Sequence, residues 1–261
     1  MQLRPTACIR KRNVPAIDAV HLIFLLIAVG VVACLYSSVG HAGASGYIAV
    51  MTLFGLAATT IRPTALLLNI LVATIGSVQF WRAGYFSWQL FWPFAVLSVP
   101  AAYLGGHLQL PVTVLRILIG VVLLFSALRL FFRKRDPDEA EPPSPAVAIV
   151  LGGSIGLLSG LTGTGGGIFL TPMLLFFQWA KIRPAAAVSA LFILLNSIAG
   201  LAGYLTASGS VPFLGLILAG AAIAGGAAGS YCGSRRFPTR SISLALATVL
   251  VIAGLKLIFT R

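Results

Sequence analysis

Apolar runs of roughly membrane-spanning length recur from one end of the chain to the other. A helix needs about 20 mainly apolar residues to cross a bilayer. Ten segments of this kind can be placed at roughly 17–37, 46–60, 63–80, 87–109, 111–132, 146–160, 165–180, 184–205, 211–232 and 239–259. Only 9% of the 261 residues are charged, which is too few to cover a soluble surface. A membrane barrel would show short alternating strands instead, so the sequence predicts an all-α, multi-pass membrane protein.

The charged residues fit a bilayer better than a nucleic acid. The net charge is +13, but the basic residues stand mostly at segment ends, where topology and anionic lipid explain them. We therefore expect the lipid bilayer as a partner and no nucleic acid. The run Arg10–Arg12 precedes an apolar stretch without a cleavage pattern, so we interpret that stretch as a retained span in a bacterial inner membrane.

The chain is predicted to contain two related halves. A shift of 121 residues places Gly46 on Gly167 and Ile61–Pro63 on Ile182–Pro184, and "AGY" at 83–85 matches "AGY" at 202–204. We therefore divide the chain into a basic tail (1–16), a first repeat (17–132), a hydrophilic linker (133–145) and a second repeat (146–261). Because five crossings are an odd number, the second repeat is predicted to be inverted. An outside N-terminus then leaves most basic turns in the cytoplasm.

Each half contains a cluster of small residues at the end of its first apolar segment. These clusters are "SVGHAGASG" at 38–46 and "SGLTGTGGG" at 159–167. The segments that follow are about 15 residues long, which as helix is too short for a core of about 30 Å. We expect a broken or re-entrant helix pair in each half, whose exposed N–H groups attract anions. Close helix packing through glycine is the alternative.

The second cluster carries a resemblance to a known family. The stretch "GLLSGLTGTGGGIFLTPML" at 156–174 resembles the signature of the TauE/SafE sulfite exporter family, with a glycine run followed by a proline. The first half departs from it, because Ala44 and Ser45 replace glycines, His41 is added and the proline is missing. The resemblance implies a secondary transporter of small anions, such as sulfite, organosulfonates or related sulfur-containing anions.

The candidate substrate-binding residues follow from the two clusters and from the polar residues in the segments after them. They are His41, Gly43, Ser45, Gly46, Asn69, Gly163, Gly165, Gly166, Gly167, Ser189 and Asn196. All five acidic residues lie at a span edge or in the linker, so no buried carboxylate opposes an anion or binds a coupling cation. Proton coupling could then run through His41. The alternative for Asn69 and Asn196 is that their amides form hydrogen bonds between helices and bind no substrate.

Two rival functions remain open at this point. A passive anion channel would need the same broken helices as a carrier. The run "GASG" at 43–46 also matches a short motif of rhomboid intramembrane proteases, with Ser45 as the nucleophile. Because Gly166 occupies the matching position of the second half, we expect a transporter and no enzyme. We also expect no metal and no cofactor, and we leave a homodimer open.

Overall fold

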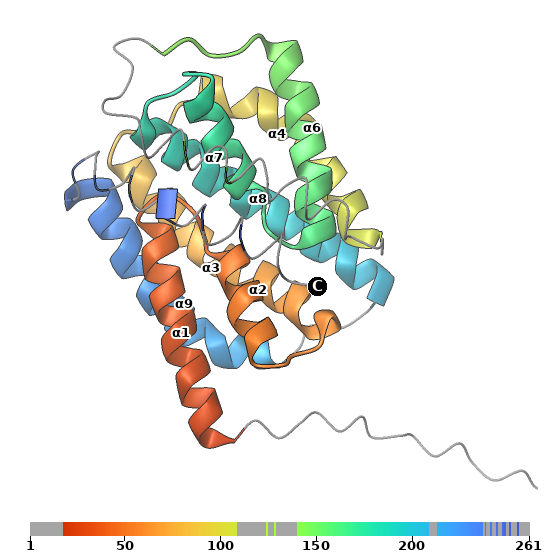
Figure 1. Cartoon of the computed structure of the whole chain (residues 1–261). Helices are drawn as coiled ribbons and strands as arrows, with labels where there is room; N and C mark the ends of the chain where they lie inside the picture. Colours follow the sequence, from red (N-terminus) through yellow and green to blue (C-terminus); the bar gives the residue numbers. More distant parts are fainter. Residues whose placement is uncertain are drawn as a thin grey trace, which may run out of the picture.

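The computed structural model describes residues 18–108, 140–208 and 213–236, together with a few single residues between 124 and 255. Over this part of the chain the structure is all-helical (Figure 1). It contains α1 (Ala19–Ser37), α2 (Ala44–Leu53), α3 (Ala58–Arg82), α4 (Trp88–His107), α6 (Pro145–Thr162), α7 (Gly167–Phe176), α8 (Ile182–Ser208), α9 (Leu214–Tyr231) and the π-helical turn η1 (Cys232–Arg236).

The helical class and most segment positions predicted from the sequence are confirmed over these residues. Five helices in the described part of the chain are long and apolar enough to cross a membrane: Ala19–Ser37, Thr59–Arg82, Pro145–Thr162, Ile182–Ala207 and Leu214–Arg236. The predicted segment 46–60 is wrong at its end, because α2 stops at Leu53 and residues 58–60 already belong to α3. The predicted segments 111–132 and 239–259, the tail 1–16 and most of the linker 133–145 lie outside the described residues.

The early start of α3 explains how the helix accommodates Pro63. A proline has no N–H group, so it leaves the carbonyl four residues earlier without its helical partner. That carbonyl belongs to Thr59, and the hydroxyl of Tyr204 in α8 donates to it at 3.0 Å. The segment boundary placed before Pro63 was therefore wrong because a side chain from the other half supplies the missing donor.

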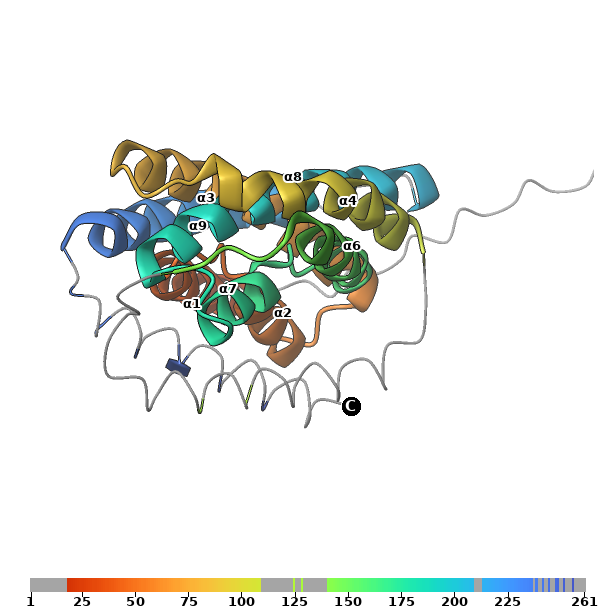
Figure 2. The same cartoon turned by 90° about the horizontal axis from the view of Figure 1, so that it is seen from above.

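The helices form two layers. Figure 2 shows α3, α4, α8 and α9 in one layer, with α1, α2, α6 and α7 packed on one of its faces. Among the described helices, most of the main contacting pairs occur in matched couples: α1 packs on α9 as α6 packs on α4, α3 on α9 as α8 on α4, and α2 on α3 as α7 on α8. The contact between α1 and α2 has no counterpart of similar extent between α6 and α7. Exchanging α1–α4 with α6–α9 leaves the matched pairs, and the contact between α3 and α8, unchanged.

Two stripes of glycine bring helices from different halves into close contact. In each stripe a glycine recurs every four residues, and an added Cβ would overlap a backbone carbonyl of the facing helix. Gly152, Gly156 and Gly160 of α6 face Phe94, Ser98 and Ala102 of α4, and Gly225, Gly229 and Gly233 of α9 and η1 face Gly30, Cys34 and Ser38 of α1. Because both series run in the same direction, each helix pair is parallel. This spacing is the small-residue packing typical of membrane helices.

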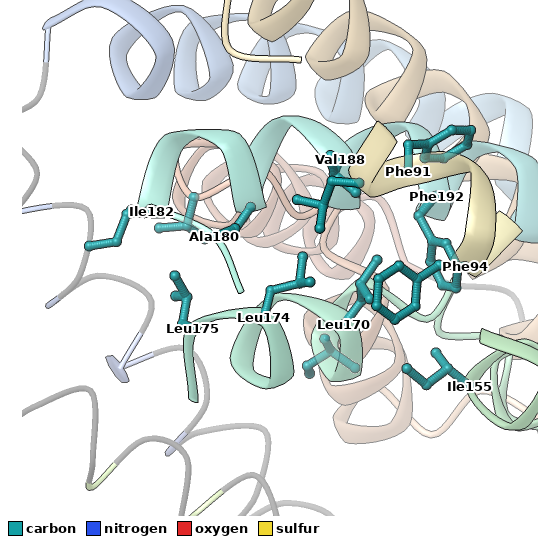
Figure 3. Packing of buried hydrophobic residues seen from close by; sticks show 14 of the residues in the cluster. Phe91, Phe94, Ile155, Leu170, Leu174, Leu175, Ala180, Ile182, Val188 and Phe192 are labelled. Carbon is teal, nitrogen blue, oxygen red and sulfur yellow. The ribbon is translucent and has the colours of Figure 1, made fainter. Parts of the chain in front are cut away.

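An apolar cluster holds the short helix α7 against α8 and α4. Leu170 and Leu174 of α7 pack with Val188 and Phe192 of α8 and with Phe94 of α4, as Figure 3 shows. All five side chains are buried. The cluster fixes the direction of α7, which begins at Gly167, the last residue of the second glycine cluster.

Candidate functional site

The structure contains a chain break at each glycine cluster. Between α1 and α2 the chain passes through residues 38–43, and between α6 and α7 it passes through 163–166. The residues that cap α2 and α7 at their N-termini are Gly43 and Gly166, with φ of 103° and 82°. Side chains rarely adopt this left-handed conformation. The prediction of a broken helix in each half is thus confirmed.

The first turns of α2 and α7 meet between α3 and α8. The ring of His41, just before α2, lies next to the backbone of Gly167, the first residue of α7. Ile193 of α8 connects the two turns, because it clusters with Ala44 of α2 and also lies against Gly165 and Gly167. The two breaks are therefore neighbours in space although they lie more than a hundred residues apart in the sequence.

His41 is enclosed at this meeting point. Its side chain is 4% exposed. Nδ1 lies 3.3 Å from the carbonyl oxygen of Val39, and Nε2 has no hydrogen-bond partner among the described residues. Which ring nitrogen carries the proton depends on the tautomer. The nitrogen without a proton accepts a hydrogen bond when the ring is neutral, and both nitrogens donate when the ring is protonated.

Asn69 lies at the second break. The amide is fully buried, and Nδ2 donates to the carbonyl of Thr164 and to the hydroxyl of Ser197, both at 3.3 Å. Within the described part of the chain, Oδ1 has no hydrogen-bond partner. A Cβ added to Gly165 would lie 2.7 Å from Nδ2, so the glycine is what allows the amide to approach the break.

The predicted glycines of both clusters lie in or beside these breaks. Gly163 packs on the backbone and side-chain stem of Arg62, and Gly46 packs on Val32 and Tyr36 of α1. Gly166 packs on Phe192, Ile155 and the Cβ of Ser159. Only Gly165, next to Asn69, and Gly167, next to His41, are placed by these contacts directly beside the two predicted polar side chains.

Comparison with known proteins supports the transporter interpretation. Residues 25–257 match the model of the family described as sulfite exporter TauE/SafE. The chain belongs to the TauE/SafE family. It is similar to the probable membrane transporter protein y4hK of Sinorhizobium fredii, with 41% identity over 241 residues that cover 90% of this chain and 97% of that one. A probable membrane transporter protein of Methanocaldococcus jannaschii, MJ0441, is 30% identical over 126 residues, 47% of each chain. No solved structure matches the chain.

Membership of the TauE/SafE family makes this a multi-pass membrane transporter and not an enzyme. Ser45 was the nucleophile of the rival protease hypothesis, and its hydroxyl instead forms a hydrogen bond within the fold. Its Oγ donates to the hydroxyl of Tyr36 at 3.0 Å, and the hydroxyl of Tyr47 donates to the Ala42 carbonyl at 2.6 Å. These bonds tie α1, the first break and α2 together.

The side-chain hydrogen bonds of two predicted residues of this TauE/SafE chain go to groups other than His41 and Asn69, although the Ser189 carbonyl lies 3.5 Å from a Cβ added to Gly167. Ser189 accepts a hydrogen bond from Thr171 of α7 at 2.6 Å. The amide of Asn196 accepts from Ser98 of α4 at 2.6 Å and donates to the Phe192 carbonyl at 2.9 Å. Oδ1 of Asn196 therefore joins α8 to α4, which is the helix-joining role that the sequence left open, and Nδ2 is satisfied within α8 itself.

Some polar groups at the breaks were not among the predicted residues. Ser197 and the Thr164 carbonyl hold Asn69. Ser159 is fully buried beside Gly166, and its Oγ has no partner among the described residues. Ser159 and Thr164 belong to the glycine-rich motif itself, so the motif was a signal that could have identified them. Nothing in the sequence distinguishes Ser197 from other serines in apolar segments.

Two arginine–tyrosine pairs connect the halves at opposite ends of α3 and α8. The guanidinium carbon of Arg62, in the first turns of α3, lies 5.7 Å from the ring centre of Tyr204 near the end of α8. Arg183, at the start of α8, lies 5.0 Å from the ring centre of Tyr85, just after α3. In each pair, the arginine of the Ile-Arg-Pro motif of one half meets the tyrosine of the Ala-Gly-Tyr motif of the other half. Because the start of each helix thus lies beside the end of the other, α3 and α8 run antiparallel.

Arg62 also closes the ends of two other helices. Its guanidinium donates to the carbonyls of Gly105 at 2.7 Å, Gly106 at 2.9 Å and Leu108 at 3.2 Å, and to the carbonyl of Gly160. These carbonyls belong to the last turns of α4 and α6, where a cation is stabilised by the helix dipole. Arg62 thus holds the end of α6 next to the break that follows it.

Proposed function

We propose that this chain is a secondary transporter of small anions, of the sulfite, organosulfonate or related sulfur-anion type. The substrate binds where the first turns of α2 and α7 meet. The observation that carries the proposal is this convergence of two helix N-termini around the buried His41. Its Nε2 has no hydrogen-bond partner by geometry among the described residues, and its ring lies next to the Gly167 backbone. The first N–H groups of a helix have no acceptor within the helix, and the dipole favours negative charge there.

The arrangement of the two halves supports an alternating-access mechanism. Most of the main contacts among the described helices come in couples that survive an exchange of α1–α4 with α6–α9. Their central helices, α3 and α8, are antiparallel, as the crosswise arginine–tyrosine pairs require. Equivalent helices that run in opposite directions are what inverted repeats produce, and in such transporters the site lies at the repeat interface. We therefore assign the two glycine clusters to equivalent positions of inverted repeats.

A carrier fits the structure better than a passive channel. His41 is 4% exposed and Asn69 is fully buried, so the polar groups of the site are covered. An arginine–tyrosine pair connects the two halves at each end of α3 and α8. A covered site with contacts at both ends is expected of a carrier between its two open states.

The test is flux into proteoliposomes that contain the full chain. Sulfite, thiosulfate, sulfoacetate, sulfate and chloride are offered in turn, with and without a pH gradient. We expect saturable movement and counterflow of at least one sulfur anion, and a channel would give flux without counterflow. Gly220→Leu is the matched control for substitutions at the breaks, because Gly220 is exposed and no atom lies within 4 Å of its added Cβ. No movement of any sulfur anion by folded protein would contradict the proposed substrate class.

A further inference from the structure

The amide of Asn69 has an orientation that its neighbours determine. The Thr164 carbonyl can only accept a hydrogen bond, so the atom facing it must be Nδ2. The second N–H of the same nitrogen points to the Ser197 hydroxyl. Both donors of the amide are therefore engaged inside the protein. Only the acceptor Oδ1 is left for a ligand, and a ligand without a hydrogen-bond donor cannot form a hydrogen bond with it.

The unpartnered Oδ1 is unusual enough to need an explanation. Nearly all buried polar atoms have a partner, and a buried acceptor without one carries an uncompensated desolvation cost. Asn69 is fully buried and Oδ1 has no partner in the part of the chain that the structure describes. A group that enters the site and donates a hydrogen bond would remove this cost.

The corresponding place in the other half shows that packing does not require the amide. The shift of 121 residues places Asn69 on Ala190 and Ser197 on Gly76. These two small residues also meet across α3 and α8, with 3.8 Å between the Ala190 Cβ and a Cβ added to Gly76. The contact between α3 and α8 therefore has no polar side chain at Gly76 and Ala190, but it has a buried hydroxyl and amide at the corresponding Ser197 and Asn69. The polar pair therefore has a role beyond joining α3 to α8.

We propose that the site selects anions that carry their own hydrogen-bond donor, and that Asn69 Oδ1 is the residue atom that accepts this donor. The inference rests on the proposed function and deepens it. The first turns of α2 and α7 bind the negative charge, and Oδ1 binds an O–H or N–H group on the same ligand. The favoured class is hydrogen oxyanions and hydroxy- or amino-sulfonates, and anions without a donor are disfavoured.

The experiment compares two sulfonates of the same charge and nearly the same shape. In 2-hydroxyethanesulfonate a hydroxyl stands where 1-propanesulfonate has a methyl group, and both are monoanions over the whole working pH range. Uptake of each is measured in proteoliposomes with the full chain, and binding is measured separately by ligand-induced thermal stabilisation in detergent. We expect the hydroxylated probe to be preferred at least about fivefold, the factor that corresponds to one unsatisfied buried acceptor.

Variants assign the preference to Oδ1. Asn69→Leu keeps the branching of the side chain at a larger volume and removes the acceptor together with the Nδ2 donor, so it should abolish the preference or reverse it in favour of the methyl group. Ser197→Ala keeps Oδ1 and the Thr164 contact, so the preference should persist whatever happens to the absolute rate. If Asn69→Leu does not fold, Asn69→Ala gives the same comparison by thermal stabilisation.

The outcomes separate this inference from the function on which it rests. Equal use of both probes by the wild-type chain would overturn the role of Asn69 and leave the anion site standing. A preference that survives in Asn69→Leu would also overturn it, because another group would then accept the hydroxyl. Failure of folded protein to bind or move either probe would overturn both this inference and the proposed substrate class.

Discussion

Replacing Gly166 by alanine is the perturbation whose magnitude the structure defines best. Gly166 caps α7 with φ of 82°, a conformation that costs an ordinary residue about 1 to 2 kcal/mol. The added Cβ would lie 2.8 Å from Cε1 of Phe192 and 3.1 Å from Cγ2 of Ile155. Such overpacking of a buried site costs about 1 to 3 kcal/mol more. The native conformation of the break should therefore be disfavoured by about 2 to 5 kcal/mol.

This cost should appear in transport rather than in membrane insertion. At about 1.4 kcal/mol per factor of ten, it lowers the population of the native break by roughly 30-fold or more. Rotating residue 166 to a negative φ would relieve the strain, but it would also turn the first N–H groups of α7 away from the site. The long helices do not depend on this residue, so the chain should still reach the membrane.

The assay is initial flux per inserted protein in proteoliposomes, with the inserted amount measured on the same vesicles. Gly220→Ala serves as the control, because the exposed Gly220 offers open space to an added Cβ. We expect near-normal flux from the control and a loss of at least about 30-fold from Gly166→Ala. Normal flux from Gly166→Ala would refute the reasoning that the geometry of the second break forms the substrate site.

Three further predictions concern other parts of the structure. His41→Gln should remove the response of flux to a pH gradient, whereas the same change at the exposed His107 should retain it; flux measured with and without the gradient decides. Arg62→Gln removes the cation from the last carbonyls of α4 and should lower the free energy of unfolding by about 2 to 3 kcal/mol, while the exposed Arg235→Gln should change the unfolding transition little. Gly156→Leu should separate α6 from α4, because any side chain there overlaps the Ser98 carbonyl; a wild-type melting temperature in detergent would show that the stripe is not a tight contact.

The breaks could be predicted because their signal is local. A cluster such as "GHAGASG" interrupts an apolar run, and the short helix after it cannot span a membrane. Both facts lie in neighbouring residues, so the sequence also placed His41 and the glycines in or beside the breaks. The helix boundary before Pro63 was wrong for the opposite reason. The donor that lets α3 include this proline is Tyr204, which follows it by 141 residues.

The sequence alone could not show which polar residues of the long helices join two helices and which keep a free hydrogen-bonding atom at a break. Asn69 and Asn196 are both buried amides in apolar helices, and only the partners distinguish them. Asn196 meets Ser98 of α4 and is satisfied, whereas Asn69 meets the second break and keeps an unpartnered oxygen. The role of Arg62 was hidden in the same way, because the carbonyls that it binds belong to α4 and α6.

The most direct test of the central claim is to locate a bound anion. Selenite is a heavier analogue of sulfite, and its selenium can be identified by anomalous diffraction from crystals of the purified full chain. We predict a selenium peak between the first turns of α2 and α7, beside His41 and Gly167. A peak at another place, such as the exposed arginines of η1, with none at the breaks, would contradict the claim that the two helix N-termini form the substrate site.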